Sequence, residues 1–218
     1  MSKYFKSVSV SIALLGVAIN SFGAIANSAS AFLIAEPGNY VGGTLPSSGV
    51  TLTHGTNTVF RTSQTSDYSA YIYTSGDHNL SFNFSAADYS AVDNTSTNRP
   101  LAIGFYDNAR RYPFNSEINP GLNASGDGRG FNTLSGWFNV IAVSYDQSNQ
   151  VTSLAVDFAE YGENLSKSGP ALFGSLRFNS DIPLNTALPE ASSVIQMTIG
   201  LLMIGFTLRQ HRRRFNKV

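Results

Sequence analysis

Apolar and polar residues alternate with a period of two along several short stretches in the middle of the chain. The stretch from Leu80 to Ser85 alternates strictly, and a Gly-Asp-His-Asn turn separates it from Ala70 to Tyr73. Such alternation predicts strands with one face in the core and the other in water. The longest pair, Trp137 to Tyr145 and Val151 to Phe158, is joined by a short polar turn and predicts an antiparallel hairpin. Four of its side chains are expected in the core: Ile141, Val143, Leu154 and Val156.

Two further stretches also have strand character. In the first, Leu101, Ile103 and Phe105 fall on one face, and the second runs from Ala171 to Asn179. Asn115 to Gly130 is rich in Gly, Pro and Asn, shows neither period, and is expected to be a long irregular connection. Since no segment of the middle has a helical period, the predicted fold class is all-β, an antiparallel β-sandwich or barrel.

The N-terminal 31 residues have the order of a secretory signal peptide. Two lysines begin the segment, residues 8–18 are mostly apolar, and small residues follow. Ala29 and Ala31 supply the A-x-A pattern that is typical of the cleavage site, and Ala24 with Ala26 offers a second one. We therefore expect residues 1–31 to be removed during export.

The C-terminal residues 188–218 have the composition of a membrane-spanning tail. Residues 191–208 carry no charge, and a helix of this length would extend roughly 27 Å, about the thickness of a bilayer core. Basic residues follow it directly and are expected to stay on the cytoplasmic side of the membrane. These residues are Arg209, Arg212, Arg213, Arg214 and Lys217.

This tail resembles the PEP-CTERM sorting signal of Gram-negative bacteria that produce exopolysaccharide. Pro189 and Glu190 match the first two residues of its motif, and Ala191 stands where a second proline is usual. The resemblance implies recognition by exosortase, a membrane-embedded processing enzyme, with cleavage near Pro189 and Glu190. It also implies an inner-membrane anchor facing the periplasm before processing, and release to the cell surface or the medium afterwards.

Residues 32–187 then remain as one secreted domain, which is enough chain for its own core. This domain carries seven basic and thirteen acidic side chains, a net charge of about −6 that the neutral total hides. An acidic domain argues against nucleic-acid binding. The chain has no cysteine, which excludes disulfides, thiolate metal sites and a cysteine nucleophile.

Short motifs across the domain resemble a recurrent secreted β-domain of bacteria with no settled function. Many relatives carry one cysteine after a Gly-Arg-Gly and another after an Asp-Phe, and these look like a disulfide pair. Phe131 and Gly162 stand at those places here, as expected if packing replaces a bridge. The motifs are Gly38–Gly42, Tyr112–Phe114, Gly128–Gly130, Asn132–Phe138, Asp157–Phe158 and Leu172–Ser180.

No catalytic residue, metal-ligand set or cofactor is assigned from the sequence. Asp157, Glu160 and Glu163 could form a carboxylate pair for glycoside hydrolysis, but their position also fits solvated acids at a strand end. Asp107 and Asp127 lie beside Asn or Gly in segments that would suit calcium or a simple turn. The three histidines have no ligand spacing. Aromatic residues could stack on sugars or simply build strands: Tyr68, Tyr71, Tyr73, Tyr106, Tyr112 and Trp137.

The expected function is a non-catalytic structural or binding role in the envelope or matrix, linked to exopolysaccharide. The alternative is a secreted enzyme that acts on polysaccharide, such as a glycoside hydrolase. The candidate ligand-binding residues are Arg110, Arg111, Tyr112 and Arg129, which flank the irregular segment. Guanidinium forks and aromatic faces suit polar or anionic glycans, whereas a purely structural role would have these arginines neutralise neighbouring acids.

Overall fold

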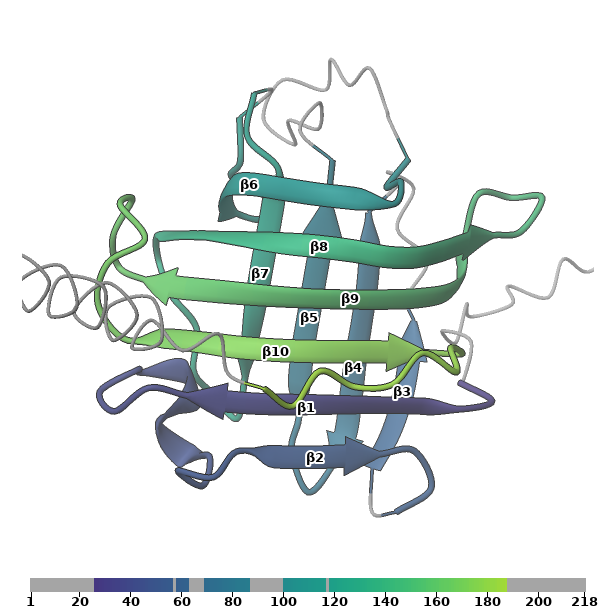
Figure 1. Cartoon of the computed structure of the whole chain (residues 1–218), viewed down its shortest axis with the longest axis horizontal. Coiled ribbons are helices and arrows are strands. Elements are labelled where there is room, and N and C mark those ends of the chain that lie inside the picture. Colours follow the sequence, from purple (N-terminus) through teal and green to yellow (C-terminus); the bar gives the residue numbers. More distant parts are fainter. Residues whose placement is uncertain (1–25, 57, 63–68, 87–99, 117, 188–218) are drawn as a thin grey trace, which may run out of the picture.

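The computed structural model describes residues 26–56, 58–62, 69–86, 100–116 and 118–187. Ten strands form one sheet, and the predicted all-β class is confirmed (Figure 1). The strands and the single 3-10 turn are β1 (Ala29–Ala35), η1 (Val41–Thr44), β2 (Val50–Thr53), β3 (Thr58–Thr62), β4 (Ala70–Gly76), β5 (Leu80–Ser85), β6 (Gly104–Arg111), β7 (Gly121–Gly126), β8 (Leu134–Tyr145), β9 (Val151–Gly162) and β10 (Ala171–Phe178).

The sheet has the strand order β2-β1-β10-β9-β8-β6-β7-β5-β4-β3 and curls back on itself as a nearly closed, barrel-like structure. Figure 1 shows β1, β2, β6, β8, β9 and β10 as a front layer, with β3, β4, β5 and β7 running crosswise behind it. All neighbours are antiparallel except β6 and β7, which meet at the corner between the layers. This corner is where the continuous sheet changes direction.

Aromatic side chains between the layers form the centre of the core. Phe84 of the rear layer contacts Phe138 and Phe158 of the front layer, with ring centroids 5.4 and 5.6 Å apart. Tyr106 stacks on Phe138 at 4.6 Å. The alternation seen in the sequence produces this arrangement, because every second residue of each strand points inward. Residues 26–187 thus contain all ten strands and their own core, and form a folding unit.

The predicted hairpin is confirmed as β8 and β9, which pair antiparallel along their length. Leu154 and Val156 are fully buried, as expected. Ile141 and Val143 are only half-buried. The reason is a bulge between Val140 and Ala142, where Ile141 is the extra residue and the alternation is interrupted.

The sequence interpretation was wrong in two places near the corner. Leu101 is buried, but Ile103 and Phe105 are 72% and 62% exposed, because β6 turns Tyr106 rather than Phe105 toward the core. The segment from Asn115 to Gly130 also contains a regular strand, β7, which pairs with β5 over its whole length. Its sequence, Gly-Leu-Asn-Ala-Ser-Gly, has only one large apolar residue, so its period was not visible.

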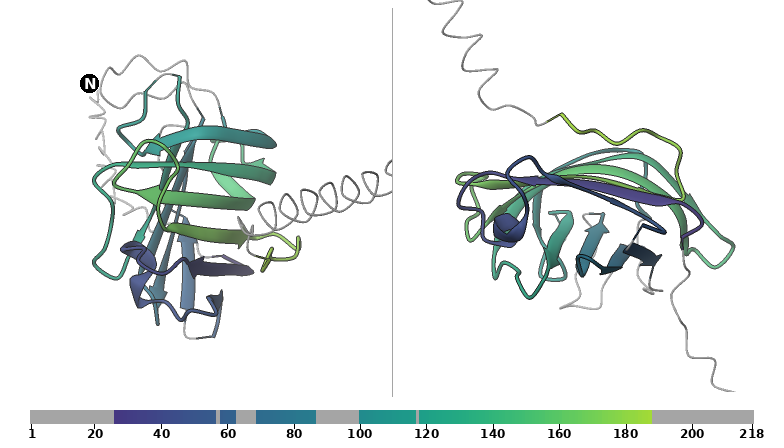
Figure 2. Two further views of the ribbon diagram at one scale, coloured as in Figure 1. Left: turned by 60° about the vertical axis from the view of Figure 1, so that its left-hand side comes forward. Right: turned by 90° about the horizontal axis from the view of Figure 1, so that it is seen from below.

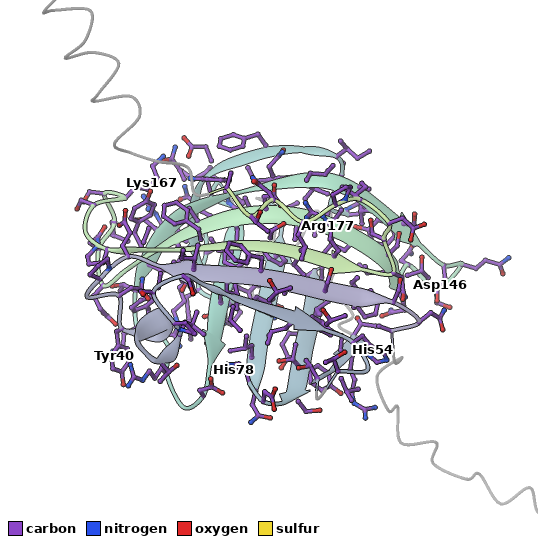
Figure 3. The ribbon with its side chains drawn as sticks, turned by 60° about the horizontal axis from the view of Figure 1, so that its bottom comes forward. Tyr40, His54, His78, Asp146, Lys167 and Arg177 are labelled. Atoms are coloured by element: carbon purple, nitrogen blue, oxygen red, sulfur yellow. The ribbon has the colours of Figure 1, made fainter. Side chains whose placement is uncertain are left out.

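After β10 the chain folds back over the outer side of the front layer. Residues 180–187, here called the strap, lie on the side away from β3, β4, β5 and β7 (Figure 2, right). Arg177, 2% exposed and labelled in Figure 3, holds the strap by donating to the carbonyl oxygens of Ile182 and Pro183. Its guanidinium also forms an ion pair with Asp157 at 2.9 Å. Asn185 then bonds to Ser175 and Asp157, so the strap runs antiparallel to β10.

The candidate cleavage residues Ala29 and Ala31 lie inside β1, opposite Phe178 and Leu176 of β10. Ala31 is fully buried. A chain that began at residue 32 would lack the first three residues of this strand. Cleavage after Ala26, at the second candidate, would leave β1 whole.

The predicted tail lies outside the described residues. This holds for Pro189, Glu190 and the basic cluster, and for the segment 191–208. In the described parts of residues 26–187, no helix is long and apolar enough to cross a membrane.

Candidate functional site

A cleft of about 650 Å³ opens at the corner where β6 separates from β7. Such a volume is in the range of small-ligand sites. Its walls come from the outer face of β4, β5 and β7, from the end of β6, and from the loop that follows β7. The residues that line it are Tyr71, Asn83, Arg111, Tyr112, Pro113, Asn123, Ser125, Gly126, Gly128, Arg129, Gly130, Phe131 and Asn132.

The cleft exists because β6 and β7 pair over only two positions, Arg110 with Gly121 and Arg111 with Leu122. The N–H of Tyr112 donates to the carbonyl oxygen of Leu122 at 2.9 Å, after which the chain turns away from β7. The edge of β7 beyond Leu122 therefore has no neighbouring strand in the described residues. The loop after β7 forms the opposite wall of the resulting gap.

Two arginine side chains lie at the walls of the cleft. Nη1 of Arg111 donates to the carbonyl oxygen of Asn132 at 3.1 Å, and the guanidinium lies 4.9 Å from the ring centre of Phe114. Its Nε is buried and has no hydrogen-bond partner in the part of the chain that the structure describes. Nη1 of Arg129 donates to the carbonyl oxygen of Tyr40 at 2.9 Å, over the ring of that residue. Figure 3 shows Tyr40 beside η1, at the lower left of the molecule in that view.

Neither arginine forms an ion pair with a described residue. The ion pairs found among the described residues join His78 to Asp127, Lys167 to Asp107, and Arg177 to Asp157. The structural explanation, in which the arginines neutralise adjacent acids, therefore has no support at Arg111 or Arg129. Among the described residues, no carboxylate forms an ion pair with either guanidinium group.

Of the four candidate ligand-binding residues, the structure brings three to one cleft. Arg111 and Tyr112 reach it from the end of β6, and Arg129 from the loop after β7. Arg110 does not line it; its Nη1 donates to the carbonyl oxygen of Leu165, on a different loop. Sequence reasoning missed Asn83 and Asn123, which face each other in register on β5 and β7. Their only sequence signal is a polar residue at an outward position of each strand.

The loop between β7 and β8 is tied to the end of β9. The N–H of Asn132 donates to Glu163 at 2.8 Å. The ring of Phe131 covers Gly162 so closely that a Cβ added to this glycine would lie about 2.0 Å from the ring. Phe131 and Gly162 are thus in contact, and packing links the loop to the end of β9.

Glu160 lies directly behind the cleft and is fully buried. Its Oε2 accepts a 2.6 Å hydrogen bond from the N–H of Ala124, on the edge of β7 that β6 leaves open. Its Oε1 has no partner among the described residues. Burial raises the pKa of this carboxyl from 4.5 to about 8, against the opposing effect of the Ala124 bond. Since Asn123 and Ser125 flank Ala124, Glu160 fixes the strand that carries two cleft residues.

The three acids considered for glycoside hydrolysis do not converge. Asp157 lies on the outer face of the front layer and binds Arg177, whereas Glu160 points into the core from the same strand. Glu163 accepts from the loop at Asn132. None of the described residues that line the cleft is Asp or Glu. The described wall of the cleft therefore offers no carboxylate pair for the hydrolysis of a glycosidic bond.

The remaining sequence candidates have structural partners. Asp127 binds Nδ1 of His78 at 2.6 Å and the N–H of Asn79, and Asp107 binds Lys167. Within the described part of the chain, no three His, Cys, Asp or Glu residues are grouped as a metal site would need. Tyr106 lies in the core, Tyr71 and Tyr73 stack on each other on β4, and Tyr68 is outside the described residues.

Comparison with protein-family models, with curated proteins and with solved structures finds no match to this chain.

Proposed function

We propose that the chain is an exported envelope or matrix protein whose β-domain binds an acidic polysaccharide in the corner cleft, without catalysis. The observation that carries this proposal is the pair of arginines, Arg111 and Arg129, which line one cleft with no carboxylate partner among the described residues. On an acidic domain, a cationic cleft favours a ligand that brings its own negative charge.

The chemistry of the lining fits a sugar that carries carboxylate groups. A guanidinium group binds a carboxylate through parallel N–H donors, and Arg111 and Arg129 form no ion pair with a described residue. The amides of Asn83, Asn123 and Asn132 can donate to and accept from sugar hydroxyls. The ring of Tyr71 supplies an apolar face for a pyranose ring.

The export part of the proposal rests on the sequence. The signal peptide, the Pro189–Glu190 motif and the basic end support delivery through the inner membrane and processing by exosortase. A protein that is exported with exopolysaccharide meets that polymer at high local concentration. Binding of the polymer by the β-domain then gives a retained envelope or matrix component.

Calorimetry on residues 26–187 tests the binding site with defined probes. An oligogalacturonate, which carries one carboxylate per sugar, is titrated at low ionic strength, and neutral dextran of similar length is the comparison. We expect binding of the acidic oligomer only, weakened by salt because the contacts are partly exposed. Arg111→Gln and Arg129→Gln should each weaken it at least about tenfold, or about 1.4 kcal/mol.

Arg110→Gln is the matched control, because it removes the same charge from the adjacent residue, outside the cleft. Equal losses from Arg110→Gln and Arg111→Gln would show a general charge effect and no defined site. Absence of heat with the acidic oligomer at millimolar concentration contradicts the binding proposal. Release of shorter sugars during incubation would instead support the enzymatic alternative.

A further inference from the structure

An apolar row crosses the outer face of the front layer, on the side away from the core. Ile34, Phe173, Ala159 and Trp137 are direct cross-strand neighbours on β1, β10, β9 and β8. They pack together as a cluster separate from the main core. Phe105 of β6 extends the row, with its ring 5.5 Å from that of Trp137.

The row ends in exposed apolar surface. Phe105 is 62% exposed and Ile103, just before β6, is 72% exposed. The outer face of a sandwich layer is normally polar, so an apolar face on both sides of one layer marks a contact surface. The strap reaches the row at Asn185 and Ala187, which line a small cavity together with Trp137 and Phe173, and it leaves Phe105 and Ile103 exposed.

The sequence beyond Ala187 indicates what the face meets. The uncharged segment 191–208 begins four residues after Ala187, a distance of at most about 14 Å of extended chain. When this segment spans a bilayer, the surface of the bilayer lies within that distance of the row. Trp and Phe side chains favour this interfacial depth.

We propose that the outer face formed by Trp137, Phe105 and Ile103 rests on the phospholipid surface while the tail is in the membrane. This inference rests on the proposed membrane insertion of the tail. The domain is then held with one layer against the lipid, and the cleft, built on the outer face of the other layer, is directed away from the membrane. The anchored protein presents its polysaccharide site outward.

The experiment tests the contact of this face with lipid independently of the tail. Residues 26–187 with a hexahistidine tag directly after Ala187 are attached to vesicles that contain a nickel-chelating lipid. The tag supplies the attachment, so neither insertion of the tail nor binding in the cleft affects the result. Trp137 is the only tryptophan in the chain, and its fluorescence is measured with phosphatidylcholine that is plain or brominated in the upper acyl chain.

We expect brominated lipid to quench Trp137, and the double variant Phe105→Ser/Ile103→Ser to lose at least about half of that quenching. Both residues are exposed, so the variant should fold. Tyr73→Ser is the matched control, since it removes an aromatic side chain from the outer face of the rear layer. No quenching of the wild-type domain, or quenching that the double variant retains, overturns the proposal.

A further outcome would assign the face to another occupant. If the emission of Trp137 on plain lipid changes with the surface density of attached protein, two copies of the domain contact each other through this face. That result overturns the contact with lipid.

Discussion

Replacement of Glu160 with glutamine should remove most of the pH dependence of stability between pH 5 and pH 8. Glu160 is fully buried, one oxygen is bonded to the N–H of Ala124, and the other has no partner among the described residues. Burial raises its pKa from 4.5 to about 8, so the folded protein keeps this proton at pH values where the unfolded chain has released it.

The direction in which stability changes with pH follows from the number of protons that the folded and unfolded states bind. A carboxyl whose pKa is raised in the folded state does not lower the free energy of unfolding below pH 4.5. It lowers that free energy increasingly as the pH rises, and the loss becomes constant above about pH 8. At about 1.4 kcal/mol per pH unit, the full cost is roughly 5 kcal/mol. This is a large fraction of the stability of a domain of this size. Glutamine stays neutral and keeps the acceptor for Ala124.

The assay is urea unfolding of residues 26–187, followed by the fluorescence of Trp137 at pH 5, 6, 7 and 8. The advantage of Glu160→Gln over wild type should grow by about 1.4 kcal/mol per pH unit, or roughly 4 kcal/mol across the range. Glu163→Gln is the control, because that acid is exposed at the end of the same strand. A difference in stability that stays constant from pH 5 to pH 8 would refute the argument.

Two other substitutions test the packing, and one measurement tests where the exported chain begins. Gly162→Ala should lower stability by about 1–3 kcal/mol in thermal unfolding, because its Cβ displaces the ring of Phe131; an unchanged melting temperature would contradict this. Val156→Asp places a charge in the core and should prevent cooperative folding, which circular dichroism detects. Mass spectrometry of the exported protein should find Asn27 as its first residue, since cleavage after Ala31 shortens β1; a start at Phe32 would refute that reading.

The strands with strict alternation could be predicted from the sequence, and those without it could not. β5 and β9 have large apolar residues at alternate positions over part of their length, and both pair as predicted, whereas the bulge at Ile141 interrupts the alternation of β8. β7 has one, so its place in the sheet depends on pairing with β5 rather than on its own pattern. In β6 the alternation was visible, but it did not show which face points into the core. Phe105 is apolar although it lies on the outer face of that layer, and Tyr106 points into the core.

The candidate site was predicted in part. Arg111, Tyr112 and Arg129 drew attention because they flank a Gly-rich segment, and the structure places them at one cleft. Their neighbours Asn83 and Asn123 come from other strands and meet the arginines only through the sheet register. Periodicity describes one strand at a time, so it could not show that a short β6–β7 pairing opens the corner.

Because of the strap, the force that detaches the tail from the domain should depend on the direction of the pull. The strap residues Ile182, Asn185 and Ala187 meet the front layer one after another along β10, toward the start of that strand. A pull on the tail perpendicular to the sheet would detach them one at a time, beginning at Ala187. A pull along β10 would load them together and put the hydrogen bonds from Arg177 to Ile182 and Pro183 under shear. The attachment should therefore yield easily when the tail is lifted and resist strongly when it is dragged sideways.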